Sequence, residues 1–370
     1  MKKATLINRR NLSKALLAGT VLPLASNAER IYKAAGQTNS TQKPFTYSKA
    51  TKNFIKMFGL EYPIVQAPAG GVVSADFVAT VSNTGCLGGM PLSWSGEAGA
   101  TAAVEKIKQQ TIGQFFVNFV LTFEPVALKA ALIAGAKIVQ FSWGMPTKAQ
   151  ATLIKSHGAS MGIQVTSKES AVTALELGAD YLVCQGTEAG GHVHASRSLP
   201  DALAEVLSVS KNTPVIASGG IASGQSIRKY LDMGAAGVVM GTRFVATQEC
   251  AAHQTYKQSL VEAKKEDTVF TTCMNKGWDN GTHRILRNST FKMWEASGCA
   301  KVGSRPGEHD KVAQYNKDAP IDRYSITSPG AQITGDIEAL ANYAGKGVSH
   351  ITDIPTVEVM IKRLWKAVKA

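Results

Sequence analysis

The chain has 370 residues, of which 44% are hydrophobic, 18% are charged and 34 are glycine, a composition typical of a globular protein with one large domain or two ordinary ones. No apolar run approaches the roughly 20 residues of a membrane-spanning helix, so we expect no membrane span. The net charge of +13 is spread along the chain without a dense block of Lys and Arg, so we expect no nucleic-acid partner.

The first 28 residues have the layout of an export signal. A basic head with five positive charges and no acid precedes a short apolar stretch and the small-residue end 26–28. The pair Arg9-Arg10 resembles a twin-arginine signal, which exports folded proteins. We predict a twin-arginine-like export signal at 1–28 and a periplasmic or exported protein, whose net charge after removal of 1–28 would be +8. The alternative is a basic amphipathic helix of a cytoplasmic protein.

From residue 62, eight short and continuously apolar runs alternate with amphipathic ones. Continuous apolar runs are typical of parallel strands that are buried on both faces. We predict strands at 62–68, 85–90, 115–120, 136–142, 159–165, 179–185, 213–219 and 236–241.

Helices are expected between these strands. In 167–180, Ser167 would cap the start of a helix and Gly178 would end it, and 223–235 repeats this pattern with Gly234 at its end. Strict alternation of eight strands with helices predicts an α/β fold of the (β/α)8 TIM-barrel type at 54–267. An open, doubly wound sheet is the alternative, but no G-x-G-x-x-G follows the first strand.

Two other segments flank the predicted barrel. Residues 29–53 are polar and are predicted as an extended lead-in. Residues 268–370 are rich in Gly, Asn and charge, with scattered aromatics such as Trp278 and Trp294. We predict that they form a smaller, irregular C-terminal cover subdomain with a closing amphipathic helix at 356–368.

The five cysteines predict no disulfide framework and no zinc cluster. They are odd in number and form no C-x-x-C pair. Cys86 and Cys184 lie in strand-like runs, where a thiol is expected to be buried as a small apolar group.

Glycine turns follow the seventh and eighth strands, at 218–220 and at Gly241-Thr242. Barrel enzymes build their sites at the carboxyl ends of the strands, and this is where a phosphate group usually binds. Two such turns on adjacent strands, each opening a helix, predict a phosphate site, although both could be ordinary turns.

The segment "QGTEAGGHVH" (185–194) leaves the sixth strand at the same rim. Its glycines would let the backbone lie flat against a planar ring, and His192 could exchange a proton with a substrate above that ring. The alternatives are a structural histidine, which is the favoured reading of His194, and a zinc site formed by both histidines. Glu188 is expected either to cap a helix or to orient an imidazole.

Three motifs in order, "QGTEAGGH", "ASGGIASG" and "MGTRFVATQECAAHQTYK", resemble the nitronate monooxygenases, formerly called 2-nitropropane dioxygenases. The resemblance runs from about residue 54 to the C-terminal end. That family shares its fold with flavin-dependent enoyl-ACP reductases and some NADH:quinone reductases. The motifs are highly specific for this superfamily and much less so for one substrate.

The resemblance implies a non-covalent FMN and a catalytic His192. By motif position, Gly220, Met240, Gly241 and Thr242 would hold the phosphate, and the flavin would be contacted or lined by Ala67, Asn118, Gln164, Gln185 and Gly190. The segment "APAGG" (67–71) follows the first strand, and relatives often carry a methionine after its proline. The present chain has Ala69 there, which makes that side of the pocket smaller or differently shaped.

We therefore expect an enzyme that oxidises a small anionic alkyl nitronate with FMN and O2 to a carbonyl compound and nitrite, with His192 as base or anion-binding group. One alternative is an NAD(P)H-dependent FMN reductase acting on a quinone or an enoyl thioester, although an exported reductase would lack its reductant. Another is a flavin-binding protein without activity. A homodimer is one assembly to consider, since the sequence does not determine the oligomeric state.

Overall fold

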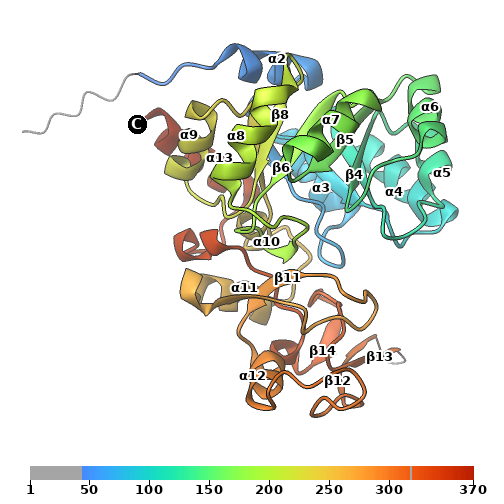
Figure 1. The fold of residues 1–370 in the computed structure, drawn as a ribbon, viewed down its shortest axis with the longest axis vertical. Coiled ribbons are helices and arrows are strands. Elements are labelled where there is room, and N and C mark those ends of the chain that lie inside the picture. The colour runs from blue at the N-terminus through green and yellow to red at the C-terminus, as the bar shows by residue number, and fades with distance from the viewer. Residues whose placement is uncertain (1–43, 317–318) are drawn as a thin grey trace, which may run out of the picture. The chain divides into compact units, whose positions relative to one another are not determined.

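The computed structural model describes residues 44–316 and 319–370, and its centre is a barrel of eight parallel strands (Figure 1). The strands are paired in the order β1-β9-β8-β6-β5-β4-β3-β2, and a parallel bridge between Val65 and Leu87 joins the two ends. This closure confirms the predicted TIM barrel and rules out the open sheet. Each predicted strand region overlaps one observed strand, and only the second strand extends beyond its predicted end, by one residue. The strands are β1 (Ile64–Gln66), β2 (Gly88–Pro91), β3 (Phe115–Val120), β4 (Ile138–Ser142), β5 (Ser160–Val165), β6 (Tyr181–Gln185), β8 (Val215–Ser218) and β9 (Gly237–Met240).

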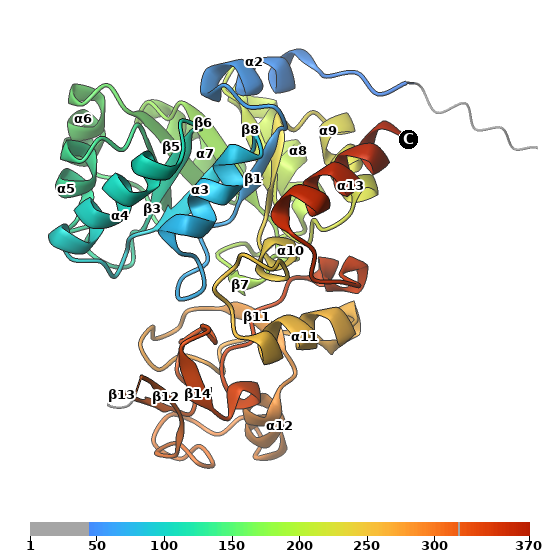
Figure 2. The ribbon, with the colours of Figure 1, turned by 180° about the vertical axis from the view of Figure 1, so that it is seen from behind.

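Eight helices surround these strands, and a large apolar core lies between the two layers. The last helix of the chain packs against the helices that follow β1 and β8, so it completes the ring (Figure 2). The short α10 (Thr242–Val245) follows β9 directly. The surrounding helices are α3 (Ala75–Asn83), α4 (Glu97–Gln110), α5 (Leu128–Ile133), α6 (Lys148–Ser156), α7 (Lys168–Glu176), α8 (Leu199–Ser210), α9 (Gly224–Asp232) and α13 (Val357–Lys369).

The predicted helix signals are confirmed. The hydroxyl of Ser167 accepts a hydrogen bond from Ser170 N at the start of α7, and Ser223 caps α9 in the same way. Gly178 and Gly234 follow the ends of these helices with φ of +81° and +103°. These positive angles explain why glycine ends both helices.

The amino end of the barrel is filled by α2 (Lys49–Phe58), which lies across it in Figure 1. Phe54 and Phe58 are buried with the apolar residues inside the barrel, and their rings lie 6.4 and 5.5 Å from that of Tyr181. This helix begins inside the stretch predicted as an extended lead-in, so residues 49–53 are helical, because the apolar face of α2 has the barrel interior to cover.

The region from α11 to η3, residues 254–350, lies beyond the carboxyl ends of the strands (Figure 1), whereas the predicted closing helix α13 belongs to the ring of barrel helices. It forms two small antiparallel sheets, one of which includes β7 (Gly191–His192), an element that follows β6. This confirms a smaller irregular subdomain, while its boundary at residue 268 stays a prediction. Its elements are α11 (Gln254–Glu262), η1 (Lys265–Asp267), β10 (Thr268–Thr271), β11 (His283–Leu286), α12 (Ser289–Ala296), β12 (Lys311–Tyr315), β13 (Ala319–Asp322), β14 (Ile333–Gly335), η2 (Ile337–Ala339) and η3 (Lys346–His350).

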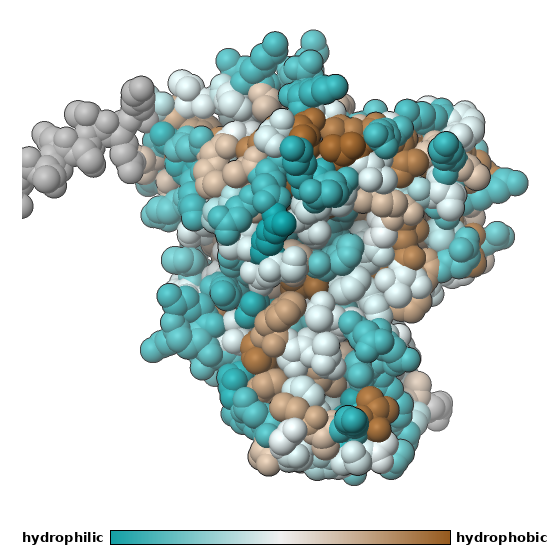
Figure 3. All heavy atoms as spheres, in the orientation of Figure 1, coloured by the Kyte–Doolittle hydropathy of each residue, from teal (hydrophilic) through white to brown (hydrophobic). Residues whose placement is uncertain are grey.

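Cys86 and Cys184 are buried free thiols, as predicted. Within the described residues no helix is long and apolar enough to cross a membrane. Hydrophilic residues are spread over the face drawn in Figure 3, with small apolar patches between them. The predicted export signal lies outside the described residues.

Candidate functional site

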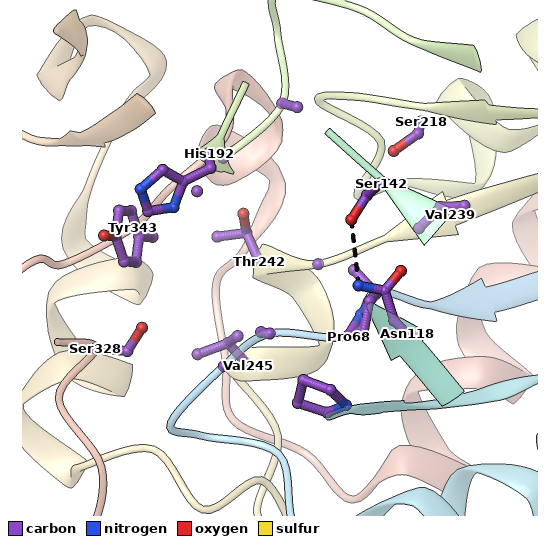
Figure 4. Close-up of a pocket in the computed structure, with 18 of the residues that line it drawn as sticks. Pro68, Asn118, Ser142, His192, Ser218, Val239, Thr242, Val245, Ser328 and Tyr343 are labelled. Carbon is purple, nitrogen blue, oxygen red and sulfur yellow. Dashed lines mark hydrogen bonds between the residues drawn. The ribbon is translucent and has the colours of Figure 1, made fainter. Parts of the chain in front are cut away.

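A cavity of about 470 Å³ opens at the carboxyl ends of the barrel strands (Figure 4). This volume is within the range of roughly 300–1,000 Å³ that is usual for small-molecule sites. In Figure 4, His192 and Tyr343 lie on one side of it, and the hydrogen-bonded pair Asn118 and Ser142 lies on the other. Nine of the predicted site residues line this cavity, namely Ala67, Asn118, Gln164, Gln185, Gly190, His192, Gly220, Gly241 and Thr242.

The side chain of Met240, the tenth predicted residue, does not line the cavity. Successive side chains of a strand point to opposite faces, so the inward direction of Val239 sends Met240 outward. Met240 is 1% exposed within the core between strands and helices, and its carbonyl accepts a hydrogen bond from Ala67 N at 2.9 Å. Only the backbone of Met240 is therefore close to the predicted phosphate position.

Buried amide side chains form the floor of the cavity. Gln140 Nε2 donates to Asn118 Oδ1, and Asn118 Nδ2 donates to Ser142 Oγ, both at 3.2 Å. In contrast, Gln164 Oε1 is buried without a hydrogen-bond partner in the described part of the chain. An unpaired buried acceptor is costly, so Gln164 is the amide best placed to serve a bound molecule.

The amide of Gln185 is already engaged by the protein. Its Oε1 accepts from His194 N at 2.8 Å and its Nε2 donates to His192 O at 3.3 Å. These bonds tie the end of β6 to the backbone directly after the His192 Cα. Although Gln185 lines the cavity as predicted, the geometry makes it a positioning residue for His192.

His192 is held in a strand, not in a flexible loop. Its strand β7 pairs with β11, which places Gly191 opposite Arg284 and His192 opposite His283. Arg284 reinforces this pairing, because its guanidinium donates two hydrogen bonds to Thr187 O, at 2.8 and 3.2 Å. The C-terminal region therefore fixes the backbone of the predicted catalytic residue.

The imidazole of His192 stacks on Trp278, with ring centroids 4.0 Å apart and planes 13° from parallel. Its Nε2 is buried and has no hydrogen-bond partner among the described residues. Burial, with a smaller contribution from the neighbouring His283, lowers the pKa of His192 to about 3. The ring is therefore neutral at physiological pH and retains an unused nitrogen.

The other nearby histidines have structural positions. His283 Nδ1 bonds Gly281 O at 2.7 Å while its Nε2 accepts from Met274 N at 3.1 Å, an arrangement that fits a neutral ring. His194 stacks on Trp143 at 4.9 Å. No cluster of three or more His, Cys, Asp and Glu side chains in the described chain could hold a metal ion.

Glu188 caps a helix, which decides between the two roles considered for it. Its Oε2 accepts a hydrogen bond from Leu199 N, the first residue of α8, at 2.9 Å. Such a carboxylate satisfies a free backbone N–H and interacts favourably with the helix dipole. It follows that Glu188 ties the start of the segment between β6 and α8, which contains β7, to its end at α8.

Close approach of neighbouring segments explains two predicted glycines, the flavin contact Gly190 and the phosphate residue Gly220. A Cβ added to Gly190 would lie 2.3 Å from Gly345 N, and one added to Gly220 would lie 2.9 Å from the Cβ of Glu188. Gly220 also has a φ of +65°. Thr242 Oγ1 accepts from Gly345 N at 3.0 Å, and Gly190, Gly220 and Thr242 all line the cavity.

Three aromatic residues of the site were not predicted. Trp143 follows β4, within the strand-end sequence "FSWGMP", and has a φ of +58°, a rare and strained angle for a large side chain. The sequence marks Trp278 only as one of the scattered aromatics in the predicted C-terminal cover subdomain. Tyr343, whose hydroxyl donates to Ile326 O at 3.0 Å, has no local sequence signal, because its position depends on the folding of the C-terminal region.

Comparisons with known proteins agree with this architecture. The sequence profile of the nitronate monooxygenase family matches residues 51–367. The nitronate monooxygenase of Pseudomonas aeruginosa is 26% identical over 359 residues, covering 84% of this chain and 97% of that protein. A (3aS,4S,5R,7aS)-5-hydroxy-7a-methyl-1-oxo-octahydro-1H-indene-4-carboxyl-CoA dehydrogenase of Mycobacterium tuberculosis is 30% identical over 251 residues, covering 66% of this chain and 69% of that protein.

Solved structures show the same fold. FabK from Thermotoga maritima has a TM-score of 0.69 with 24% identity, covering 86% of this chain and 96% of that one. The nitroalkane oxidase from Streptomyces ansochromogenes has a TM-score of 0.67 with 22% identity, covering 85% and 97%. At these identities the likeness concerns the fold alone.

Proposed function

Because the chain belongs to the nitronate monooxygenase family and is a flavin oxidoreductase of that type, we propose that it binds FMN and uses O2 to oxidise alkyl nitronates to a carbonyl compound and nitrite. The observation that carries this proposal is His192, a neutral imidazole with an unpartnered nitrogen, fixed at the cavity by β7. A group with these properties can bind, orient or deprotonate a substrate without first losing a proton.

The residues present fit FMN. Gln164 Oε1, His192 Nε2 and Trp143 Nε1 are buried, unpartnered polar atoms of the described chain, and all three residues line the cavity. Gly220, Gly241 and Thr242 would hold the phosphate with backbone N–H groups and a hydroxyl. FMN, when bound, would supply the redox centre that accepts electrons from the substrate and passes them to O2.

The pKa of His192 favours nitronates over their parent nitroalkanes. Burial keeps the ring neutral, so it can accept the α-proton of a nitroalkane, but the same burial makes the resulting imidazolium unfavourable. A nitronate has already lost this proton and avoids that cost. We therefore expect faster turnover of nitronates, which do not require His192 as a base, than of nitroalkanes, which do.

The test is nitrite release by the FMN-loaded enzyme and by His192→Asn, each with a nitroalkane and its nitronate. We expect the variant to lose turnover of the nitroalkane and to retain turnover of the nitronate. His309→Asn, at an exposed histidine remote from the cavity lining, is the matched control and should be unchanged. Equal loss on both substrates would contradict the base role, and no nitrite from any nitronate would contradict the function.

An NAD(P)H-dependent reductase of quinones or enoyl thioesters is the alternative. Anaerobic addition of NADH distinguishes the two, since only the reductase would lose the yellow colour of its flavin.

We also propose that residues 1–28 export the folded, FMN-loaded protein. Outside the cytoplasm NAD(P)H is scarce, whereas O2 and nitronates are present, which is consistent with the oxygen-dependent reaction. Substitution of Arg9 and Arg10 by lysine should keep the full-length protein in the cytoplasmic fraction. Unchanged fractionation would contradict export by this route.

A further inference from the structure

One wall of the cavity is aromatic and is assembled from segments far apart in the chain. Trp143 and Trp278 lie with ring centroids 4.8 Å apart at 65°. Trp278 stacks on His192, and the ring of Tyr343 lies 5.4 Å from His192. The predicted catalytic imidazole is therefore part of a continuous aromatic surface.

This surface extends outward to the mouth of the cavity. Phe123 lies 5.3 Å from Trp278 on one side and 5.3 Å from Trp94 on the other. Trp94 lines the cavity, yet 55% of its surface is exposed. A large aromatic side chain in such a position is available to contact a ligand that extends from His192 toward solvent.

The cavity lining has no fixed charge in the described part of the chain, since it contains no Asp, Glu, Lys or Arg. The nearby buried Arg284 is engaged by Thr187 O and is not part of the lining. The backbone N–H groups of the glycine turns are assigned to the FMN phosphate, so a carboxylate on the substrate would lose its hydration elsewhere in the cavity without gaining a counter-ion, which is unfavourable.

Two unpartnered nitrogens lie beside this aromatic wall. Trp143 Nε1 and His192 Nε2 are both buried without partners, and Trp143 maintains a strained backbone angle at this position. Strain of this kind is commonly retained where a side chain serves the function of a site. Trp143 therefore retains an N–H group without a partner in the described chain, next to the aromatic wall.

We infer that the substrate carries an aromatic ring that packs on the surface formed by Trp94, Trp143 and Trp278, and that it carries no charged group other than its nitronate. This inference rests on the proposed function, whose substrate class it narrows. It predicts that the nitronate of phenylnitromethane is preferred to propionate 3-nitronate, in which a carboxylate takes the place of the ring.

The first measurement compares kcat/KM for these two nitronates and for ethyl nitronate, using the FMN-loaded enzyme. We expect the aromatic nitronate to exceed propionate 3-nitronate at least tenfold. Trp94→Leu should lower the ratio of the aromatic to the ethyl substrate about tenfold, which corresponds to about 1.4 kcal/mol. Tyr315→Leu, an exposed aromatic on β12 outside the cavity lining, is the control and should leave this ratio unchanged.

The second measurement is calorimetric binding of benzyl alcohol and of benzoate to the holoenzyme, which does not require turnover. Benzyl alcohol should bind at least tenfold more tightly than benzoate, and Trp94→Leu should weaken its binding. Equal or tighter binding of benzoate, or a preference for propionate 3-nitronate, would overturn the inference. If no nitronate releases nitrite, the proposed function fails, and the binding comparison alone decides the substrate class.

Discussion

Replacement of Gln185 by methionine should remove the hydrogen bonds that connect the His192 segment to β6 without changing the packed volume at this position. Methionine has a similar shape but cannot make the two hydrogen bonds that Gln185 forms with His192 O and His194 N. Each neutral hydrogen bond contributes about 1 kcal/mol net. We therefore expect the free energy of unfolding to fall by about 2 kcal/mol.

The same substitution should lower turnover. β7 has only two residues, so the backbone around His192 depends on Gln185 and on its pairing with β11. A displacement of about 1 Å at a reacting group can reduce a rate up to about 100-fold. We expect Gln185→Met to reduce nitrite release at least tenfold while FMN remains bound.

Gln164→Met is the matched control. It removes the same amide one strand away, but Gln164 Oε1 has no partner in the described protein, so unfolding in urea should change by less than about 0.5 kcal/mol. FMN should instead dissociate more readily from Gln164→Met, as measured by flavin fluorescence after dilution. Equal destabilisation by both substitutions, or loss of FMN from Gln185→Met alone, would refute the reasoning.

Three further predictions concern pH, the glycine turn and the barrel interior. Burial lowers the pKa of His192 to about 3, so His192 should not change its protonation between pH 8 and 5. For a nitronate that is fully ionised over this range, kcat/KM should therefore be independent of pH. An inflection near pH 6.5 would contradict this. The same shift should lower the free energy of unfolding by about 1.4 kcal/mol per pH unit as the pH falls from 6.5 toward 3, because only the unfolded chain takes up this proton. Gly220→Ala should weaken FMN binding at least tenfold. Gly158→Ala is its control, because Gly158 also has a positive φ (+64°) but nothing lies within 4 Å of an added Cβ, so only stability should change. Equal FMN affinities of the two variants would argue against the glycine turn as the phosphate site. Phe54→Ala should lower the free energy of unfolding, measured in urea, by about 3–5 kcal/mol, because Phe54 is fully buried at the amino end of the barrel. A loss below about 1 kcal/mol would show that α2 does not fill this end of the barrel.

Part of the candidate site could be read from the sequence because strand ends are local features. A glycine turn after an apolar run marks the rim of a barrel and predicts Gly220 there, while the resemblance predicts Asn118 and Gln164, and all three line the cavity. Met240 shows the limit of this approach. Its motif position suggested a contact, but the alternation of side chains along β9 directs it into the core.

The sequence by itself determined the closed barrel, the helix ends at Gly178 and Gly234, and the position of His192 after the sixth strand. These depend on hydrophobic patterns and backbone preferences over a few neighbouring residues. Only the tertiary structure decided that Gln185 is engaged while Gln164 Oε1 is free, and that Trp278 and Tyr343 surround His192. Those facts arise from contacts between residues far apart in the chain, whose distances no local pattern encodes.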